Sequence, residues 1–186
     1  MRDSFSDIVT YSLQLGELVL AGRSGVYRKQ SGQFLTPAVV ARFMARQLGP
    51  IQEGDRILDP AIGSGVLVCA IIERVIAEGQ PIEFWVDGYE IDRELCQTAR
   101  EVLDWTAKRA ASHGATVHTR IYERDFVLDC APASQPSLFP TDNSGHLKTH
   151  PLYDHIIANP PYFKLKSDDP RVKAVAGQVK GQTNIY

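Results

Sequence analysis

The first fifty positions carry two hydrophobic patterns with helical spacing. The first ends near Gly22 and comprises Ile8, Tyr11, Leu15, Leu18 and Val19. The second follows Thr36-Pro37 and stops at Gly49-Pro50, with apolar residues at Val40, Phe43, Met44 and Leu48. Apolar residues every three or four positions predict amphipathic helices. Thr36 is expected to cap the second helix, with Pro37 in its first position.

From Asp55 onward, short β-rich runs alternate with longer helical patterns. The β-rich runs span 56–59, 84–90, 117–122 and 154–158, and the helical patterns span about 65–78 and 92–112. Such alternation is typical of βαβ units with parallel strands. The predicted fold class is therefore α/β, with an open, doubly wound, mostly parallel sheet preceded by N-terminal helices. The stretch 131–151 is rich in Pro, Ser, Asp and Gly, which predicts a long loop.

Composition excludes several classes of protein. A formal net charge of −2 shows no overall basic bias, so any polyanion partner must meet a local patch. The longest apolar stretch, 66–72, is far too short to span a bilayer, and Asp3 and Asp7 argue against a signal peptide. The three cysteines are scattered and lack CxxC spacing, which indicates neither a disulfide framework nor a zinc site. We expect a cytoplasmic protein with reduced thiols, no metal and no membrane contact.

Open doubly wound sheets bind ligands at the carboxyl ends of their strands, so the residues that end each strand are the candidates for chemistry. The first strand ends in "DPAIGSG", 59–65, and runs directly into a helix. Gly63 and Gly65 allow the backbone to turn tightly against a ligand. The loop lacks the glycine and lysine patterns of dinucleotide and triphosphate sites, which disfavours both ligands. A glycine-rich turn that serves packing alone stays open.

The second and third strands each end in an acidic residue. Glu90 could accept both hydroxyl hydrogens of a ribose, or be an exposed charge at a strand end. Asp92 is better explained as the N-cap of the following helix. Asp125 could accept a hydrogen bond from an exocyclic amine while Phe126 covers a purine, or Asp125 could simply form a turn.

The fourth strand leads into Asn159-Pro160-Pro161-Tyr162. A residue before proline is confined to extended backbone and each proline fixes its own φ, so this tetrapeptide is stiff. It presents the Asn159 side-chain oxygen and the Pro160 carbonyl as two neutral acceptors, beside Tyr162 as a stacking face. A plain proline-rich turn would need no such combination of amide and aromatic ring.

Taken together, these strand ends resemble the S-adenosylmethionine-dependent N6-adenine DNA methyltransferases of restriction–modification type. "DPAIGSG" is similar to the family's cofactor loop, "YEID" to its ribose-binding segment, "RDF" to its adenine-binding segment and "NPPY" to its catalytic tetrapeptide. "SGQFLTP", 31–37, precedes the cofactor loop, an order that resembles the γ class. The resemblance implies a Rossmann-like methyltransferase fold and S-adenosylmethionine as the cofactor.

The resemblance also implies a role for each matching residue. The methionine end of the cofactor would meet Phe34, Thr36, Pro37, Asp59, Ala61, Gly63 and Gly65. Glu90 would bind the ribose, and Ile91 would lie against the adenine of the cofactor. Asp125 would accept a hydrogen bond from the N6 amine of that adenine, and Phe126 would pack on its ring. The acceptor groups would be Asn159 and Pro160 within the catalytic tetrapeptide that includes Pro161. The target adenine, flipped out of double-stranded DNA, would stack on Tyr162 and Phe163.

Only part of such an enzyme is readable in this chain. We predict an N-terminal helical segment, 1–50, and the cofactor-binding half of a methyltransferase domain, 51–186, truncated at the C-terminus to about four strands. DNA would then be bound through the parent protein, and the exposed fourth strand could pair with a second copy. The basic residues after the tetrapeptide could contact phosphates or form a solvated face: Lys164, Lys166, Arg171, Lys173 and Lys180.

Three alternatives remain open. Asn-Pro-Pro-Tyr also occurs in enzymes that methylate a glutamine amide of release factors or an RNA base, and these acceptors are all planar nitrogens. A non-catalytic subunit that binds cofactor or DNA is a second alternative, which the intact tetrapeptide argues against. A Rossmann-like domain with another small ligand is the third.

Overall fold

The computed structural model describes residues 7–25, 34–130, 152–161 and 165–176. Its described part contains one four-stranded sheet in the order β3-β2-β1-β4, with every neighbouring pair parallel. The strands are β1 (Arg56–Asp59), β2 (Glu83–Glu90), β3 (Thr116–Glu123) and β4 (His155–Ile156). The predicted parallel sheet is confirmed, and β1 has the predicted bounds.

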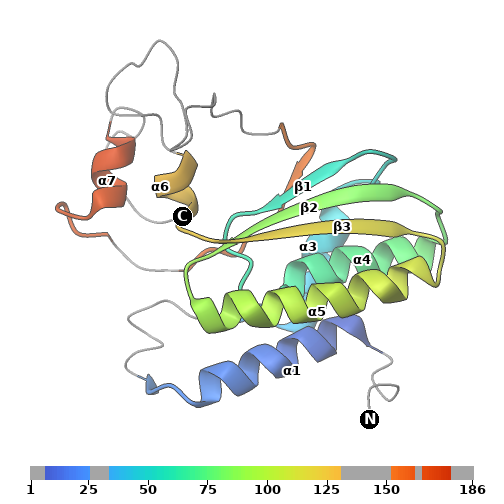
Figure 1. Ribbon diagram of the computed structural model, residues 1–186, viewed down its shortest axis with the longest axis horizontal. Coiled ribbons are helices and arrows are strands. Elements are labelled where there is room, and N and C mark those ends of the chain that lie inside the picture. The colour runs from blue at the N-terminus through green and yellow to red at the C-terminus, as the bar shows by residue number, and fades with distance from the viewer. Residues whose placement is uncertain (1–6, 26–33, 131–151, 162–164, 177–186) are drawn as a thin grey trace.

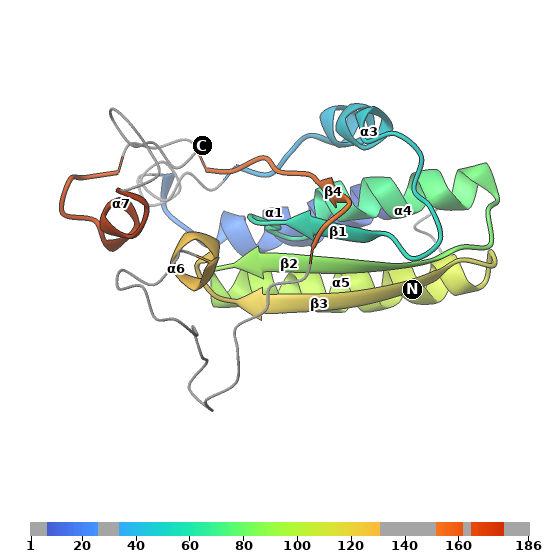
Figure 2. The ribbon, with the colours of Figure 1, turned by 90° about the horizontal axis from the view of Figure 1, so that it is seen from above.

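Six helices accompany the sheet in the described ranges: α1 (Ile8–Ala21), α3 (Ala38–Gln47), α4 (Val66–Glu78), α5 (Arg93–Ala111), α6 (Phe126–Cys130) and α7 (Pro170–Val175). Figure 1 shows α1, α4 and α5 on one side of the sheet. Figure 2 shows α6 and α7 beyond the ends to which the strand arrows point. The carboxyl ends of the strands therefore face a region bordered by α6 and α7.

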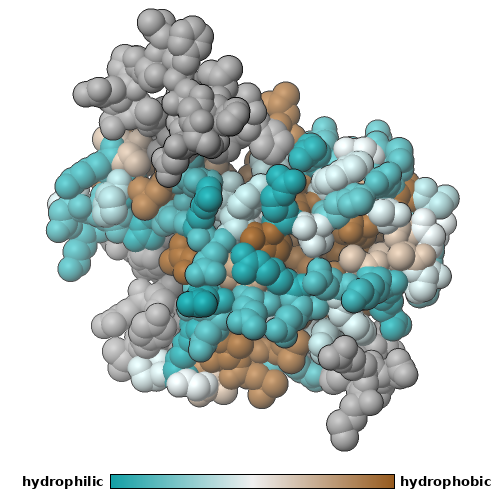
Figure 3. Space-filling model, viewed as in Figure 1, coloured by the Kyte–Doolittle hydropathy of each residue, from teal (hydrophilic) through white to brown (hydrophobic). Residues whose placement is uncertain are grey.

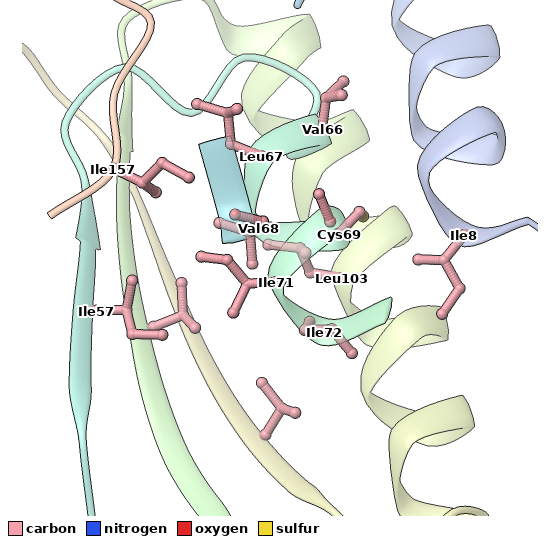
Figure 4. Close-up of a cluster of buried hydrophobic side chains, with 14 of the residues drawn as sticks. Ile8, Ile57, Val66, Leu67, Val68, Cys69, Ile71, Ile72, Leu103 and Ile157 are labelled. Carbon is pink, nitrogen blue, oxygen red and sulfur yellow. The ribbon is translucent and has the colours of Figure 1, made fainter. Parts of the chain in front are cut away.

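The core lies around α4, which packs against α1, α3 and α5. All residues of α4 from Val66 to Ile72 are buried, so the apolar run in the sequence is a helix enclosed on several sides. Figure 4 shows this cluster, in which Ile57 of β1, Ile71 of α4 and Leu103 of α5 are each fully buried. Ile8 of α1 belongs to the same cluster, so the N-terminal helix shares the core of the sheet.

The strand order places a topological switch between β1 and β4. From β1 the chain moves through β2 to β3, and then returns to the opposite side of β1 to form β4. In open parallel sheets the crevice outside the carboxyl ends at such a switch is the usual ligand site. Asp59 ends β1, and Asn159 follows β4 by three residues. The fold therefore brings the first and fourth predicted strand ends to neighbouring positions.

The structure corrects the predicted start of α3 and the predicted length of the fourth strand. Thr36 does not cap α3 and Pro37 is not its first residue: Pro37 is the N-cap, the helix begins at Ala38, and no side chain caps that end. The strand β4 itself, His155–Ile156, is shorter than the predicted strand 154–158, although the N–H groups of Asp154 and Ile157 also donate to β1, to the carbonyls of Arg56 and Leu58. The five-residue helix α6 was not predicted.

On the face seen in Figure 3, hydrophilic residues predominate over α5, while hydrophobic ones gather over α1, where Leu18 is 70% exposed. Within the described ranges, no helix combines the length and the apolar character needed to cross a membrane.

Candidate functional site at the carboxyl ends of the strands

The loop that joins β1 to α4 is held by the end of β2. The Glu90 carboxylate accepts hydrogen bonds from the N–H of Gly63 at 3.0 Å and from the N–H of Asp92 at 2.8 Å. The Ile62 N–H donates to the Tyr89 carbonyl at 2.9 Å. Burial of Glu90 raises the pKa of its carboxyl. Glu90 is the residue predicted to bind a ribose, and in the structure its carboxylate also holds this loop.

The turn itself requires glycine. Gly63 has a φ of 57° and Gly65 a φ of 90°, a left-handed conformation that residues with a Cβ rarely adopt. The N–H of Gly65 donates to Ile62 within the turn, and that of Ala61 donates to the Asp59 carboxylate. These amides therefore bond within the protein instead of forming a phosphate cradle.

Asp59 is fully buried at the end of β1. Its Oδ1 accepts from the Ala61 N–H at 3.1 Å, while the buried Oδ2 has no hydrogen-bond partner among the described residues. Burial, aided by the nearby charge of Glu90, raises the pKa of Asp59 to about 7. An unpartnered carboxylate oxygen inside a protein is costly unless a donor or a cation satisfies it. The site thus contains one strong acceptor that the described protein groups leave unsatisfied.

The amide of Asn159 meets the segment before α3. Its Nδ2 donates to the Thr36 hydroxyl oxygen at 2.9 Å, across 123 positions of sequence. Thr36 is only 6% exposed, and Asn159, Pro160 and Pro161 are half-buried. The family resemblance implied that both residues lie near the methyl donor, but no pattern in the sequence indicated this contact.

The end of β3 presents a second group of predicted residues. Asp125 Oδ1 accepts from the Leu128 N–H at 3.0 Å, so the carboxylate holds the first turn of α6. The Phe126 ring meets Tyr89 edge-on, with centroids 5.2 Å apart. Ile91 and Phe34 are 62% and 57% exposed, so both offer apolar surface. Asp125 therefore forms a turn, which was the alternative to its predicted role in binding an amine.

Tyr162 and Phe163, the predicted stacking residues, lie outside the described residues, as do Lys164 and Lys180. Lys166 and Lys173 are exposed. Arg171 pairs with Asp169 at 2.6 Å and lies 3.7 Å from the Asp125 carboxylate. Arg171 is thus engaged in ion pairs inside the protein. Within the described ranges no three His, Cys, Asp or Glu side chains gather as a metal site.

Comparison with known proteins decides the family. The sequence profile of the N-6 DNA Methylase family matches residues 2–180 of this chain. The chain belongs to that family. The resemblance inferred from the motifs is confirmed.

Relatives of this N-6 DNA methylase chain include two bacterial type II methyltransferases. M.AccI of Acinetobacter calcoaceticus is 27% identical over 86% of this chain and 24% of its own length. M.PstI of Providencia stuartii is 28% identical over 74% of this chain and 25% of its own length. The tRNA1(Val) (adenine(37)-N6)-methyltransferase of Shewanella sediminis is 29% identical over 62% of this chain and 36% of its own. The chain spans about a quarter of the length of both type II methyltransferases.

A solved structure from Listeria monocytogenes, assigned to the class I S-adenosylmethionine-dependent methyltransferases, matches with a TM-score of 0.55 and 16% identity. The match covers 99% of this chain and 48% of that one. At this identity the likeness concerns the fold alone. It confirms the predicted Rossmann-like methyltransferase fold for the N-6 DNA methylase chain.

Sequence reasoning missed one ion pair that supports this site. Arg23, just after α1, binds both oxygens of Asp92 at 2.6 and 2.8 Å and also contacts Glu94 at 2.8 Å. Asp92 caps α5, as predicted, and its N–H bonds Glu90. Arg23 also lines a hollow of about 440 Å³ between α1 and α5, which none of the predicted site residues lines. The sequence could not predict this ion pair, because no spacing pattern relates Arg23 to a carboxylate 69 positions later.

Proposed function

We propose that the protein containing this chain transfers a methyl group from S-adenosylmethionine to the N6 amine of adenine in DNA. The observation that carries the proposal is the position of the Asn159 amide, which follows β4 at the topological switch beside the loop that ends β1. Membership of the N-6 DNA Methylase family and two type II methyltransferase relatives support it.

The site residues fit such a cofactor. When bound, S-adenosylmethionine supplies an electrophilic methyl group on a positively charged sulfur. The Oδ2 of Asp59, which has no partner in the described part of the chain, would accept a hydrogen bond from a donor or pair with a cation at the methionine end, beside Thr36, Pro37 and the loop residues. Glu90 would accept ribose hydroxyls, because its two oxygens can accept further hydrogen bonds beside those from the backbone, which include the Gly63 and Asp92 N–H groups. Ile91, Asp125 and Phe126 would hold the adenine, and Phe34 would cover the methionine end.

The acceptor residues address a specific chemical difficulty. The N6 amine of adenine is a poor nucleophile because its lone pair is delocalised into the ring. Hydrogen bonds from its two N–H groups to Asn159 Oδ1 and the Pro160 carbonyl would favour a more tetrahedral nitrogen and so make the lone pair available. Neutral acceptors suffice, and positioning of the two reactants supplies much of the remaining rate enhancement.

A base within a duplex cannot reach such a pocket. We therefore include base flipping in the proposal, with Tyr162 and Phe163 as stacking partners on the evidence of the sequence. Unstacking costs a few kcal/mol, and each stacking contact returns about 1–3 kcal/mol.

The test uses the full-length protein that contains this chain, with S-adenosylmethionine and unmethylated DNA, and measures N6-methyladenine by mass spectrometry. Asn159→Ala is expected to abolish transfer, a loss on the order of a hundredfold or more, with unchanged cofactor affinity by calorimetry. Gln97→Ala removes an exposed amide from α5 and is expected to leave the rate unchanged. Near wild-type methylation by Asn159→Ala would contradict the role of this amide.

A second acceptor is tested in the same assay. The tRNA relative acts on an adenine N6 according to its name, and release-factor glutamine is also a planar nitrogen. Assays of the full-length protein with DNA, tRNA or release factor as the methyl acceptor distinguish these three possible substrates. Methylation of tRNA or release factor without methylation of DNA would replace the proposed substrate.

A further inference from the structure

We infer that Thr36 is a positioning residue for Asn159, whose amide it holds with the oxygen directed to the acceptor amine. This inference rests on the proposed function and assigns Thr36 a task other than contact with the cofactor. The direct observation is the 2.9 Å bond in which Asn159 Nδ2 donates to Thr36 Oγ1. The bond engages the nitrogen end of the amide, so the oxygen lies at the opposite end of the same planar group.

The two ends of an amide have nearly the same shape and opposite hydrogen-bonding character. If the Asn159 amide turned over, its NH2 group would face the N–H groups of the adenine amine, and donor would meet donor. A partner on Nδ2 disfavours that arrangement. Since the proposed chemistry depends on a single acceptor oxygen, its orientation affects the rate directly.

Thr36 is a rigid anchor for this purpose. It precedes Pro37, which confines its backbone to extended conformations, and its β-branched side chain has restricted rotation at χ1. Burial to 6% exposure limits competition from water for the hydroxyl. Thr36 does not cap α3, so its side chain is not committed to that helix end.

The neighbouring Leu35 fixes Thr36 to the rest of the site. A Cβ placed on Gly16 of α1 would lie 2.6 Å from Leu35 Cδ1, and one placed on Gly63 would lie 3.6 Å from Leu35 Cδ2. Leu35 therefore packs between α1 and the β1–α4 loop. Through these contacts the position of the Asn159 amide is tied to the loop that would hold the methyl donor.

The experiment uses the full-length protein and compares Thr36→Val, Thr36→Ser and the control Thr106→Val. Valine keeps the shape and removes the hydroxyl, whereas serine keeps the hydroxyl. Thr106 is as buried as Thr36, but its hydroxyl bonds the Val102 carbonyl within α5, away from the strand ends. For each variant, kcat and KM for DNA, the cofactor Kd and the melting temperature would be measured.

Thr36→Val is expected to lower kcat about tenfold or more, with cofactor Kd and KM for DNA within about twofold of wild type. Thr36→Ser is expected to retain most of kcat, and Thr106→Val all of it. A raised cofactor Kd with kcat unchanged at saturation would overturn the inference and assign Thr36 to the cofactor. Equal losses in the valine and serine variants would also overturn it.

A double-mutant cycle keeps this result separate from the proposed function. Thr36→Val is expected to lower the melting temperature of the wild type and to lower it much less in an Asn159→Ala background, because the bond is then already absent. If the decreases in melting temperature of the two single variants simply added in the double variant, the Thr36–Asn159 hydrogen bond would be contradicted, whether or not DNA is the substrate. If the wild-type protein methylates none of the three acceptors, the proposed function is wrong, but the double-mutant cycle still shows whether Thr36 and Asn159 interact.

Discussion

The carboxyl of Asp59 lies fully inside the protein, with one oxygen on the Ala61 N–H and the other without a partner among the described residues. Burial raises its pKa from 3.8 to about 7. The folded, unliganded protein therefore favours the neutral acid over a pH range in which an unfolded chain would have ionised it. A cationic group bound beside Oδ2 would reverse this preference.

The sign of the resulting pH dependence follows from linkage. Because the folded pKa is the higher one, the stabilisation is complete below about pH 4 and is lost as the pH rises through about 7. Asp59 should lower the free energy of unfolding by up to about 1.4 kcal/mol per pH unit in that window. Asp59→Asn removes this contribution. Urea titrations at several pH values would measure the free energy of unfolding. If it changed with pH equally in the variant and the wild type between pH 4 and 7, the raised pKa of Asp59 would be contradicted.

At the scale of elements, the ends of α1, β2 and α5 meet through one ion pair. The Arg23 and Asp92 side chains are each 12% exposed, and the guanidinium engages both carboxylate oxygens. Asp92 also donates its N–H to Glu90, so the pair supports the turn that presents Glu90 and Ile91. The contact links the N-terminal helix to the proposed ribose site without contributing to it directly.

Arg23→Met is expected to destabilise the protein by about 1–3 kcal/mol, because hydrogen bonds to charged groups are lost while Asp92 stays largely buried. If the turn at Glu90 loosens, affinity for S-adenosylmethionine falls as well. Chemical denaturation and calorimetry on Arg23→Met measure the two effects. Arg46→Met, on the exposed surface of α3, is the matched control. An unchanged stability of Arg23→Met would show that the ion pair contributes nothing.

The sequence predicted those elements whose formation is governed by local pattern. Helices α1, α4 and α5 and strand β1 follow from periodicity, and the Asp92 cap follows from residue type. Thr36 was misread as a cap because Thr-Pro before an apolar run looks the same whether the hydroxyl bonds the helix or a distant amide. The helix α6 was missed because five residues are too few to show a period.

At the scale of the whole molecule, one core supports both the sheet and the site. Leu103 of α5 is fully buried, and a Cβ on Gly65 would lie 3.5 Å from its side chain. The β1–α4 turn therefore rests on the same side chains that fill the interior. The division into segments 1–50 and 51–186 stays a prediction, as does self-association through β4, whose Ile156 is 61% exposed.

Leu103→Ala is expected to lower the free energy of unfolding by about 2–5 kcal/mol, because it removes buried methyl groups and leaves a cavity. Leu18→Ala, the same substitution at a helix position that is 70% exposed, is expected to change it by less than about 0.5 kcal/mol. Denaturant unfolding of both variants makes the comparison. Similar losses at the two positions would contradict the core described above.

The sequence separation of the contacts also sets the order in which their partners are synthesised. The Ser12 hydroxyl donates to the Ser64 carbonyl of the β1–α4 loop at 2.8 Å, and Glu90 accepts from the N–H groups of Gly63 and Asp92, so the latest of these residues is Asp92. The Thr36 hydroxyl, by contrast, meets its partner only when residue 159 has been made. Since a ribosome delivers the chain from its N-terminus, every partner that steadies the loop is present well before Asn159 exists. A nascent chain thus carries all the residues that hold the β1–α4 loop while it still lacks Asn159, the residue proposed to bind the methyl acceptor.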